Sequence, residues 1–335
     1  MRLYVSFGPI LVSCPHIFVF NHPMQRLHTG MENDFILEQM HIEATPFALC
    51  ELNGKGDLGL GQDRTATLHY ILSGRGEILM TGQPNLPVSR GTLVLVPALR
   101  SHVIRSFGEG TDPMPQCRPA GLNLVHLVHN QNAADTRGGL VAICAHISLS
   151  LKNLHNVIDL VRSPIVDTVA DNPGLATPVD QVLQEIARPS LGSSAMLRVL
   201  IQQAMIALMR HKLQSQDPGL AWTKALQDPK LWPVLTHMMK TPGGDHSLDT
   251  LADHAGMSRS TLAQRFSDAY GSGPMELLRE LRMQKAADLL AQSDMPVKRI
   301  SAEVGFKSRT AFSRAFEATA GQSPRSYRRE KKAGS

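Results

Sequence analysis

A chain of 335 residues, 42% of them hydrophobic, is long enough for two domains that each bury a core. It contains no apolar run of about eighteen residues, so we expect no membrane-spanning helix. The net charge of +5 is placed unevenly: residues 241–335 carry 15 basic and 11 acidic side chains, while the rest of the chain is nearly neutral. A basic carboxyl-terminal end suits a polyanionic partner, although an ordinary solvated surface has the same composition.

The first 20 residues are apolar and almost uncharged, as in a secretory signal peptide. Pro9 and Pro15 interrupt the apolar run, however, and no clear cleavage site of small residues follows it. We therefore predict that residues 1–30 are a poorly structured extension, or that translation starts downstream at Met24 or Met31.

Short runs of β-branched or alternating residues follow, separated by turns rich in Gly, Pro and Asp. Evenly spaced short strands predict an antiparallel sandwich or barrel. With the helical region described below, the expected fold class is α+β. The predicted strands span residues 47–52, 67–72, 77–81, 92–97, 102–106, 122–129 and 140–148.

Two phrases in this region resemble the two sequence blocks of a cupin barrel. The first spans residues 68–76, and the second spans residues 91–97 and is followed by His102. The resemblance implies a small barrel with one open mouth, where a small-molecule effector could bind. The candidate ligand-binding residues are His69, Tyr70 and His102.

Metal binding is not expected in this barrel. Catalytic cupins carry a His-x-His pair in the first block, whereas His69 is followed by Tyr70 and Ile71. His69 and His102 alone are fewer than the three protein ligands usual for a catalytic site. We expect hydrogen-bonding or structural roles for both histidines, with no metal, no cofactor and no catalytic residue. A metal-dependent cupin enzyme with a helical tail is the alternative.

A G-x-G-x-x-G pattern at Gly54, Gly56 and Gly59 resembles a dinucleotide-binding loop. Such a site needs a helix directly after the glycines, so that backbone amides point at the pyrophosphate. Here a strand entry follows. We predict a flexible hairpin or loop that binds no nucleotide.

The four cysteines are widely spaced and include no C-x-x-C pair, so a zinc ribbon or a thioredoxin-type motif is absent. This spacing does not indicate a secreted disulfide scaffold, and we expect reduced thiols and a cytoplasmic protein. A buried cysteine is usually a small hydrophobic side chain. Redox sensing through Cys50, Cys117 or Cys144 is the alternative.

Two helices are predicted after the strands, at residues 179–186 and 195–212. The second carries a wide apolar stripe, part of which should pack on the barrel and part of which could contact a second subunit. We therefore expect a homodimer, with packing inside one domain as the alternative. The stripe consists of Leu197, Leu200, Ile201, Ala204, Met205, Leu208 and Met209.

A polar segment with Pro and Gly begins near residue 214, and Asp228 then precedes Pro229 as the predicted N-cap of a helix that ends near residue 239. The predicted domains are therefore residues 31–213 for sensing and dimerisation, a linker at 214–227, and a helical domain at 228–330.

The helical domain contains one helix pair twice, with the central glycines Gly256 and Gly305 placed 49 residues apart. In each copy a short helix ends at the glycine, and a serine caps the next helix. Apolar residues four apart turn that second helix inward and leave polar residues outside. The residues expected on the two outward surfaces are Ser258, Arg259, Ser260, Thr261, Gln264, Lys307, Ser308, Arg309, Thr310, Ser313 and Arg314.

Pro274 begins a long predicted helix that would hold the two copies at a fixed separation. Two reading helices about one DNA turn apart, roughly 34 Å, enter successive major grooves on one face of the duplex. The alternative is a bundle that merely repeats a helix pair and binds no DNA.

This order of features resembles the DNA-binding domain of the AraC/XylS family of bacterial transcription regulators, many of which also carry a cupin-type domain. The resemblance covers about the last hundred residues, and one departure is Gln264, where relatives more often carry Arg. The matching residues are Gly256, Met257, Ser258, Pro274, Leu277, Leu278, Arg282, Ala286, Leu289, Leu290, Gly305, Phe306, Ser308, Phe312, Arg314, Phe316, Gly321, Ser323, Pro324, Tyr327 and Arg328.

The resemblance implies a regulator that binds double-stranded DNA by sequence and responds to a small molecule or chemical signal. RNA polymerase is a further candidate partner, and a nonspecific nucleoid-type binder is a third alternative. We assign phosphate contacts to Arg259, Lys307 and Arg309. The base-reading candidates are Ser260, Gln264, Thr310, Ser313 and Arg314.

Overall fold

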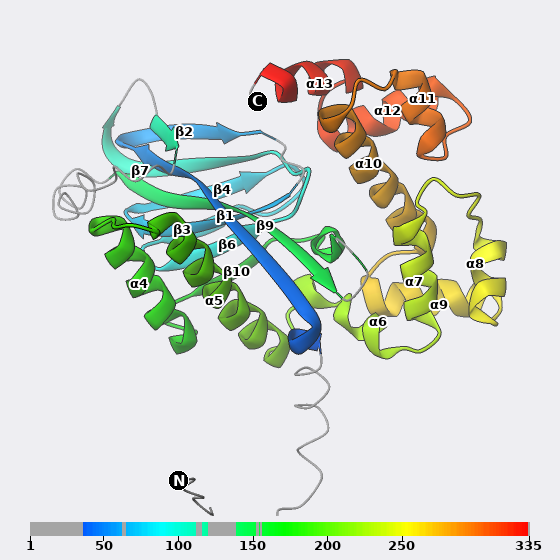
Figure 1. Cartoon of the computed structure of the whole chain (residues 1–335), viewed down its shortest axis with the longest axis horizontal. Coiled ribbons are helices and arrows are strands. Elements are labelled where there is room, and N and C mark those ends of the chain that lie inside the picture. The colour runs from blue at the N-terminus through cyan, green and yellow to red at the C-terminus, as the bar shows by residue number, and fades with distance from the viewer. Residues whose placement is uncertain are drawn as a thin grey trace, which may run out of the picture.

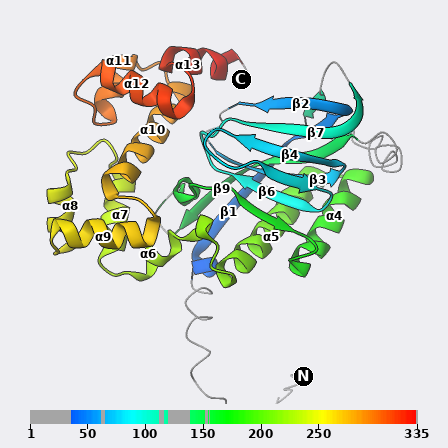
Figure 2. The same cartoon turned by 180° about the vertical axis from the view of Figure 1, so that it is seen from behind.

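The computed structural model describes residues 36–61, 65–111, 116–119, 139–151, 154 and 156–333. The predicted extension at residues 1–30, the predicted strand at 122–129 and Cys14 lie outside the described residues. Figure 1 shows strands and two covering helices on one side and a helical region on the other, and Figure 2 shows the same arrangement from behind.

Two antiparallel sheets form the amino-terminal part. The larger has the strand order β10-β6-β3-β9-β1-β8, and the smaller has the order β2-β7-β4-β5. The larger sheet consists of β1 (Met40–Leu52), β3 (Ala66–Ser73), β6 (Thr92–Val96), β8 (Gln116–Pro119), β9 (Leu140–Leu151) and β10 (Ile165–Thr168). The smaller sheet consists of β2 (Gly54–Leu60), β4 (Arg75–Met80), β5 (Leu86–Ser89) and β7 (His102–Thr111).

Side-chain alternation gives the larger sheet two buried faces. Its inner face joins the smaller sheet in one apolar core, which includes Ile71 of β3 and Ile78 of β4. Its outer face is covered by α4 (Ala176–Ala187) and α5 (Ser193–Gln214), as Figure 1 shows. Tyr70 of β3 and Leu200 of α5 belong to this second core.

The glycine-rich segment is a strand, so the prediction of a flexible loop there is wrong. β2 pairs with β7 from Gly54 to Leu60. Across this pair, Arg105 donates to both carboxylate oxygens of Asp57 at 2.8 and 2.9 Å. The loop prediction gave weight to the glycines, whereas ladder pairing with β7 overrides their low strand preference.

The segment predicted as a linker contains two short helices, η3 (Pro218–Leu220) and α6 (Thr223–Gln227). Leu220 and Trp222 are buried in the apolar core that continues into the helical region. Asp228 accepts hydrogen bonds from the amides of Lys230 and Leu231, at the start of α7 (Leu231–Lys240). This connection is therefore packed and ordered.

The carboxyl-terminal region contains the predicted repeat. The first unit is formed by α8 (Leu248–Ala255) and α9 (Arg259–Tyr270), and the second by α11 (Val297–Glu303) and α12 (Arg309–Ala320). The long helix α10 (Pro274–Gln292) lies between the units, and α13 (Pro324–Ala333) follows them. Figure 1 shows α9 and α12 near opposite ends of α10.

The two hinges have the same backbone geometry. Gly256 has φ +60° and Gly305 has φ +78°, the left-handed conformation that glycine adopts readily. The Met257 amide donates to the Ala252 carbonyl at 3.1 Å, and the Phe306 amide donates to the Ser301 carbonyl at 2.9 Å. Each hinge therefore ends its helix with the hydrogen bond of a Schellman motif.

Arg282 of α10 connects the two units. Its guanidinium donates to the carbonyls of Pro242 at 2.8 Å and Gly244 at 2.9 Å, both in the loop before the first unit. A Cβ at Gly305, the hinge of the second unit, would lie 2.8 Å from this guanidinium and from the Gly243 carbonyl. The second hinge therefore packs against the loop of the first unit.

Alanine substitutions at the two hinges should have different costs. Gly256→Ala places its Cβ in open space, so it should lose only the roughly 1–2 kcal/mol of a left-handed non-glycine residue. Gly305→Ala also collides with the Gly243 carbonyl, and we expect it to lose at least about 1 kcal/mol more. Urea unfolding of the two variants measures the difference, and equal losses would contradict the packed second hinge.

Candidate nucleic-acid interface and barrel interior

The first recognition helix, α9, presents its polar residues to solvent. Ser258 caps the helix by accepting from the Thr261 amide at 3.2 Å, and its hydroxyl also lies 3.0 Å from that of Ser260. Arg259 pairs with Asp249 at 3.2 Å, and Gln264 donates to Asp268 at 2.8 Å. DNA must therefore replace acidic partners that these two side chains already have.

The second recognition helix, α12, differs in its charges. Ser308 caps it by accepting from the Ala311 amide at 3.4 Å. Lys307, Arg309 and Arg314 are exposed, and none of them forms an ion pair with any residue in the described part of the chain. These three cations are therefore free to meet phosphates or base edges without giving up an acidic partner.

The structure places the predicted surface residues outside on both units. Ten of the eleven are exposed, and Ser313 is half-buried. The inward residues Leu262 and Phe266 of α9, and Phe312 and Phe316 of α12, are fully buried. The apolar core therefore sets which face of each helix remains available to a partner.

The barrel interior contains a buried chain of polar side chains. His69 and His102 approach each other with their Nε2 atoms 2.7 Å apart. His69 Nδ1 lies 3.1 Å from the Cys144 sulfur, and His102 Nδ1 lies 3.1 Å from the Arg100 carbonyl oxygen. This series of hydrogen bonds runs from the barrel wall to the loop between β6 and β7.

Proton positions in this chain follow from its ends. The Arg100 carbonyl only accepts, so His102 Nδ1 donates to it. With both rings neutral, His102 Nε2 then accepts from His69, and the Cys144 thiol donates to His69 Nδ1. Burial, together with the nearby His102 and His146, holds the pKa of His69 well below its usual range, which keeps that ring neutral.

Tyr70 does not join this chain. It follows His69 in the same strand, so it faces the opposite side of the sheet, in the core under α5. Burial raises its pKa to about 12. The structure therefore brings together two of the three candidate ligand-binding residues and separates the third.

The cysteines differ from the expectation of reduced thiols. Cys50 is disulfide-bonded, and the residue opposite it in the β1–β8 ladder is Cys117. Cys144 is free and buried, with its sulfur 3.5 Å from that of Cys50. Burial raises the pKa of Cys144 to about 12, so its reactive thiolate form is scarce at neutral pH.

Sequence reasoning missed Cys144 and Arg100 as partners of the two histidines. His69 faces Cys144 only because β3 and β9 pair in a particular register, across 75 residues of chain.

Within the described residues, no group of three or more His, Cys, Asp or Glu side chains is arranged to hold a metal ion. Nor does any helix of the described part reach the length and apolarity needed to span a membrane.

The neutral His69 ring makes stability depend on pH. Below its ordinary pKa of about 6.5, the unfolded chain takes up a proton at His69 that the folded chain refuses, so acid favours unfolding. His69→Gln removes this term, and its stability deficit relative to the wild type should shrink by up to about 1.4 kcal/mol per pH unit as pH falls from 6.5 to 5.5. Urea unfolding at several pH values tests this. His41→Gln, at an exposed histidine, is the control, and a constant deficit would contradict a neutral buried ring.

Two family models match the chain. A helix-turn-helix domain matches residues 251–330, and a cupin domain matches residues 34–214, more than half of the chain. The HTH-type transcriptional regulator MtrA of Neisseria gonorrhoeae is 27% identical over 270 residues, which cover 78% of this chain and 86% of that protein. The HTH-type transcriptional regulator AlkR of Acinetobacter baylyi is 22% identical over 303 residues, which cover 88% and 98%.

Solved structures resemble the chain as well. The DNA-binding domain of AdpA, in complex with a target DNA, is 33% identical over 30% of this chain and 91% of that one, with a TM-score of 0.30. ToxT of Vibrio cholerae, with a bound unsaturated fatty acid, is 11% identical over 86% of this chain and 94% of that one, with a TM-score of 0.46. The family models, the similar regulators and the two capped helix pairs of the present chain all agree. This chain belongs to the AraC/XylS family of transcription regulators and carries a cupin domain in its amino-terminal half.

Proposed function

We propose that α9 and α12 read one DNA site together, and that a small molecule or chemical signal reaching the cupin domain changes the affinity for that site. The observation that supports this most directly is the matched pair of exposed polar surfaces on two capped helices with identical hinges. The protein would act in the cytoplasm, where its DNA lies. RNA polymerase remains a candidate partner for activation.

In this proposal α12 makes more of the DNA contacts than α9. Arg314 is exposed and free of ion pairs with described residues, so it is available for bidentate binding to a guanine. Lys307 and Arg309 lie at the start of α12, where phosphate is favoured by the helix dipole. Arg259 supplies the phosphate contact of the first unit after it leaves Asp249. Ser260, Gln264, Thr310 and Ser313 complete the base-reading set.

Substitutions at Arg314 and Lys307 separate base reading from phosphate binding. On a duplex selected by the full chain from a random-sequence pool, Arg314→Ala should weaken binding by about 1–3 kcal/mol and relax the sequence preference at one position. Lys307→Ala should weaken all duplexes alike and reduce the slope of log affinity against log salt by about 1.

Fluorescence anisotropy over a salt series measures both effects. Arg90→Ala, at an exposed position of the cupin domain, is the charge-matched control and should change neither quantity. Failure to select any preferred duplex would favour the nonspecific binder. A metal that co-purifies at one equivalent per chain would favour the cupin enzyme.

We further propose that α5 pairs with α5 of a second copy. The seven residues of the predicted apolar stripe are all buried in the core shared with the sheet, so a different stripe is free. That stripe alternates spacings of three and four residues, the period of a coiled-coil seam. Its exposed members are Met196, Val199, Gln203, Ile206 and Arg210.

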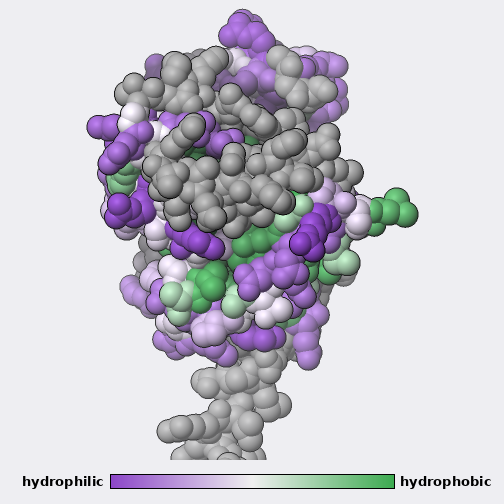
Figure 3. Space-filling view, turned by 90° about the vertical axis from the view of Figure 1, so that its left-hand side faces the viewer, coloured by the Kyte–Doolittle hydropathy of each residue, from purple (hydrophilic) through white to green (hydrophobic). Residues whose placement is uncertain are grey.

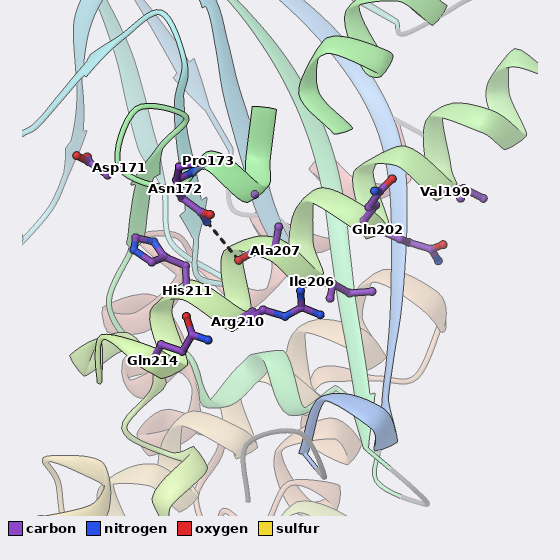
Figure 4. A pocket seen from close by; sticks show the side chains of 12 residues that line it. Asp171, Asn172, Pro173, Val199, Gln202, Ile206, Ala207, Arg210, His211 and Gln214 are labelled. Carbon is purple, nitrogen blue, oxygen red and sulfur yellow. Dashed lines mark hydrogen bonds between the residues drawn. The ribbon is translucent and has the colours of Figure 1, made fainter. Parts of the chain in front are cut away.

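A groove beside α5 supports this pairing. It has a volume of about 660 Å³, and Gln203 is among the residues that line it. Figure 4 labels three other lining residues of this stripe, Val199, Ile206 and Arg210. Gln203 is the middle residue of this stripe. In an antiparallel pair of α5 helices it would lie at the two-fold axis, where its side-chain amide would form a hydrogen bond with the side-chain amide of Gln203 in the second copy. Hydrophobic patches between hydrophilic residues are visible on the side of the molecule shown in Figure 3.

Charge placed on this stripe should produce monomers. Val199→Glu combined with Ile206→Glu puts carboxylates against each other across the two-fold axis, and sedimentation equilibrium should show loss of the dimer. Arg198→Glu, exposed on the same helix but outside the stripe, should leave the dimer intact. A dimer that survives the double substitution would place the subunit contact elsewhere.

Thiol-based sensing is the second candidate for the signal. The close approach of Cys50 and Cys144 favours it, since a sulfur 3.5 Å from a disulfide-bonded cysteine is in reach of exchange. The raised pKa of Cys144 opposes it at neutral pH. Roles for Cys50, Cys117 and Cys144 as sensors therefore stay predictions.

A further inference from the structure

A side chain of the cupin domain is built into the core of the second helix-turn-helix unit. Leu99, in the loop between β6 and β7, is 2% exposed. It belongs to a cluster of buried apolar residues whose other members lie on or next to α10, α11, α12 and α13, among them Met283, Ile300 and Phe312. The residue is therefore a plug that joins the sensing half of the chain to one reading helix.

The backbone at Leu99 is strained. Its φ is +58°, a conformation uncommon for a bulky residue, which persists only where the surroundings impose it. Two other described non-glycine residues have positive φ, Asn156 and Gln216, and both are exposed. Leu99 alone among these three holds the strain inside a core, so packing against the helical region maintains it.

The same loop is tied to the barrel interior. The carbonyl of Arg100, the residue next to Leu99, accepts from His102. His102 is bonded to His69, and His69 to Cys144, so three successive hydrogen bonds lead from the barrel wall to the plug. The side chains of Cys144, His69 and His102 are buried, which makes a hydrogen bond between them costly to leave unmade, whereas Arg100 at the end of the path is exposed.

The surroundings of the loop fix α10 yet leave the plug some room. Arg162 of the cupin domain donates to Glu276 at 2.9 Å and to Glu280 at 2.8 Å, both on α10. A cavity of about 150 Å³ beside the plug is lined by Leu99, Arg100, Arg162 and Thr319 of α12. The loop therefore has space to move without unfolding either core.

We propose that Leu99 couples the barrel interior to the second recognition helix. A change in the hydrogen bonds of His69 and His102 displaces the Arg100 carbonyl, moves Leu99 in the α10–α12 core, and so alters the position of α12 and its affinity for DNA. This coupling rests on the proposed function. Because coupling between two binding sites is reciprocal, DNA bound at α12 must also change the barrel interior.

Reciprocity allows a test that needs no knowledge of the effector. Hydrogen exchange of β3 and β9 is measured by mass spectrometry, with and without a duplex that the full chain has selected from a random-sequence pool. In the wild type, DNA should change exchange in these strands about five-fold or more. Leu99→Gly accepts positive φ and removes the plug, so it should still bind the duplex while the exchange of β3 and β9 no longer responds.

Two controls isolate the plug. Asn156→Gly relieves positive φ at an exposed position, and Arg162→Gln removes the ion pairs to α10, while both variants keep the Leu99 side chain and its hydrogen-bonded neighbour Arg100. Both should retain the response of β3 and β9 to DNA. A Leu99→Gly variant that responds like the wild type overturns the proposal, as does a wild type that binds the duplex without any response.

A variant at the other end of the path keeps the test valid if Leu99→Gly fails to fold. His69→Gln interrupts the series of hydrogen bonds inside the barrel, and it should alter the hydrogen exchange of α12 in the absence of DNA. Unchanged exchange in α12 would also overturn the proposal. Failure of the wild type to select any duplex would instead refute the proposed DNA function, so the two ideas fail separately.

Discussion

The helix α10 is buried on several sides at once, and the arrangement of the carboxyl-terminal half depends on this. Leu277, Leu278 and Leu281 pack in the core shared with the first unit, whereas Met283, Ala286 and Leu290 pack in the core of the second. Glu276 and Glu280 meet Arg162 of the cupin domain. A helix of 19 residues is about 28 Å long, close to one DNA turn. Its rigidity therefore sets the separation at which two recognition helices are presented.

The two units share a backbone design but differ in electrostatics. In the first unit, acidic residues of the same unit already engage Arg259 and Gln264. In the second, the three cations at the start and middle of α12 have no such acidic partners among the described residues. The second unit is consequently better suited to nonspecific attraction of the phosphate backbone. In the first unit, Arg259 and Gln264 keep their acidic partners until DNA of a matching sequence replaces them.

Local rules explain what could be predicted from the sequence. A glycine at a helix end followed by a capping serine fixes backbone geometry within a few residues, so both hinges and both recognition helices could be placed correctly. Contacts between distant strands were beyond such rules. The pairing of His69 with Cys144 depends on strand register, and the glycines of β2 concealed a strand that pairing with β7 stabilises. The insertion of Leu99 into another domain leaves no periodic trace at all.

The barrel interior limits what kind of signal can act there. Its polar groups already bond to one another: the Cys144 thiol to His69, His69 to His102, and His102 to a backbone carbonyl. A purely apolar molecule that separated them would leave buried donors and acceptors unmade, at a cost of about 1–3 kcal/mol each. An effector that offers its own donor and acceptor would replace those bonds instead. A chemical change at Cys144 would remove its S–H donor, so that the first bond of the chain is lost without any ligand entering. The change at Cys144 begins at the end of this hydrogen-bonded path farthest from Leu99, and an effector begins wherever it replaces a bond; the remaining bonds of the same path would carry either one toward the DNA-binding half.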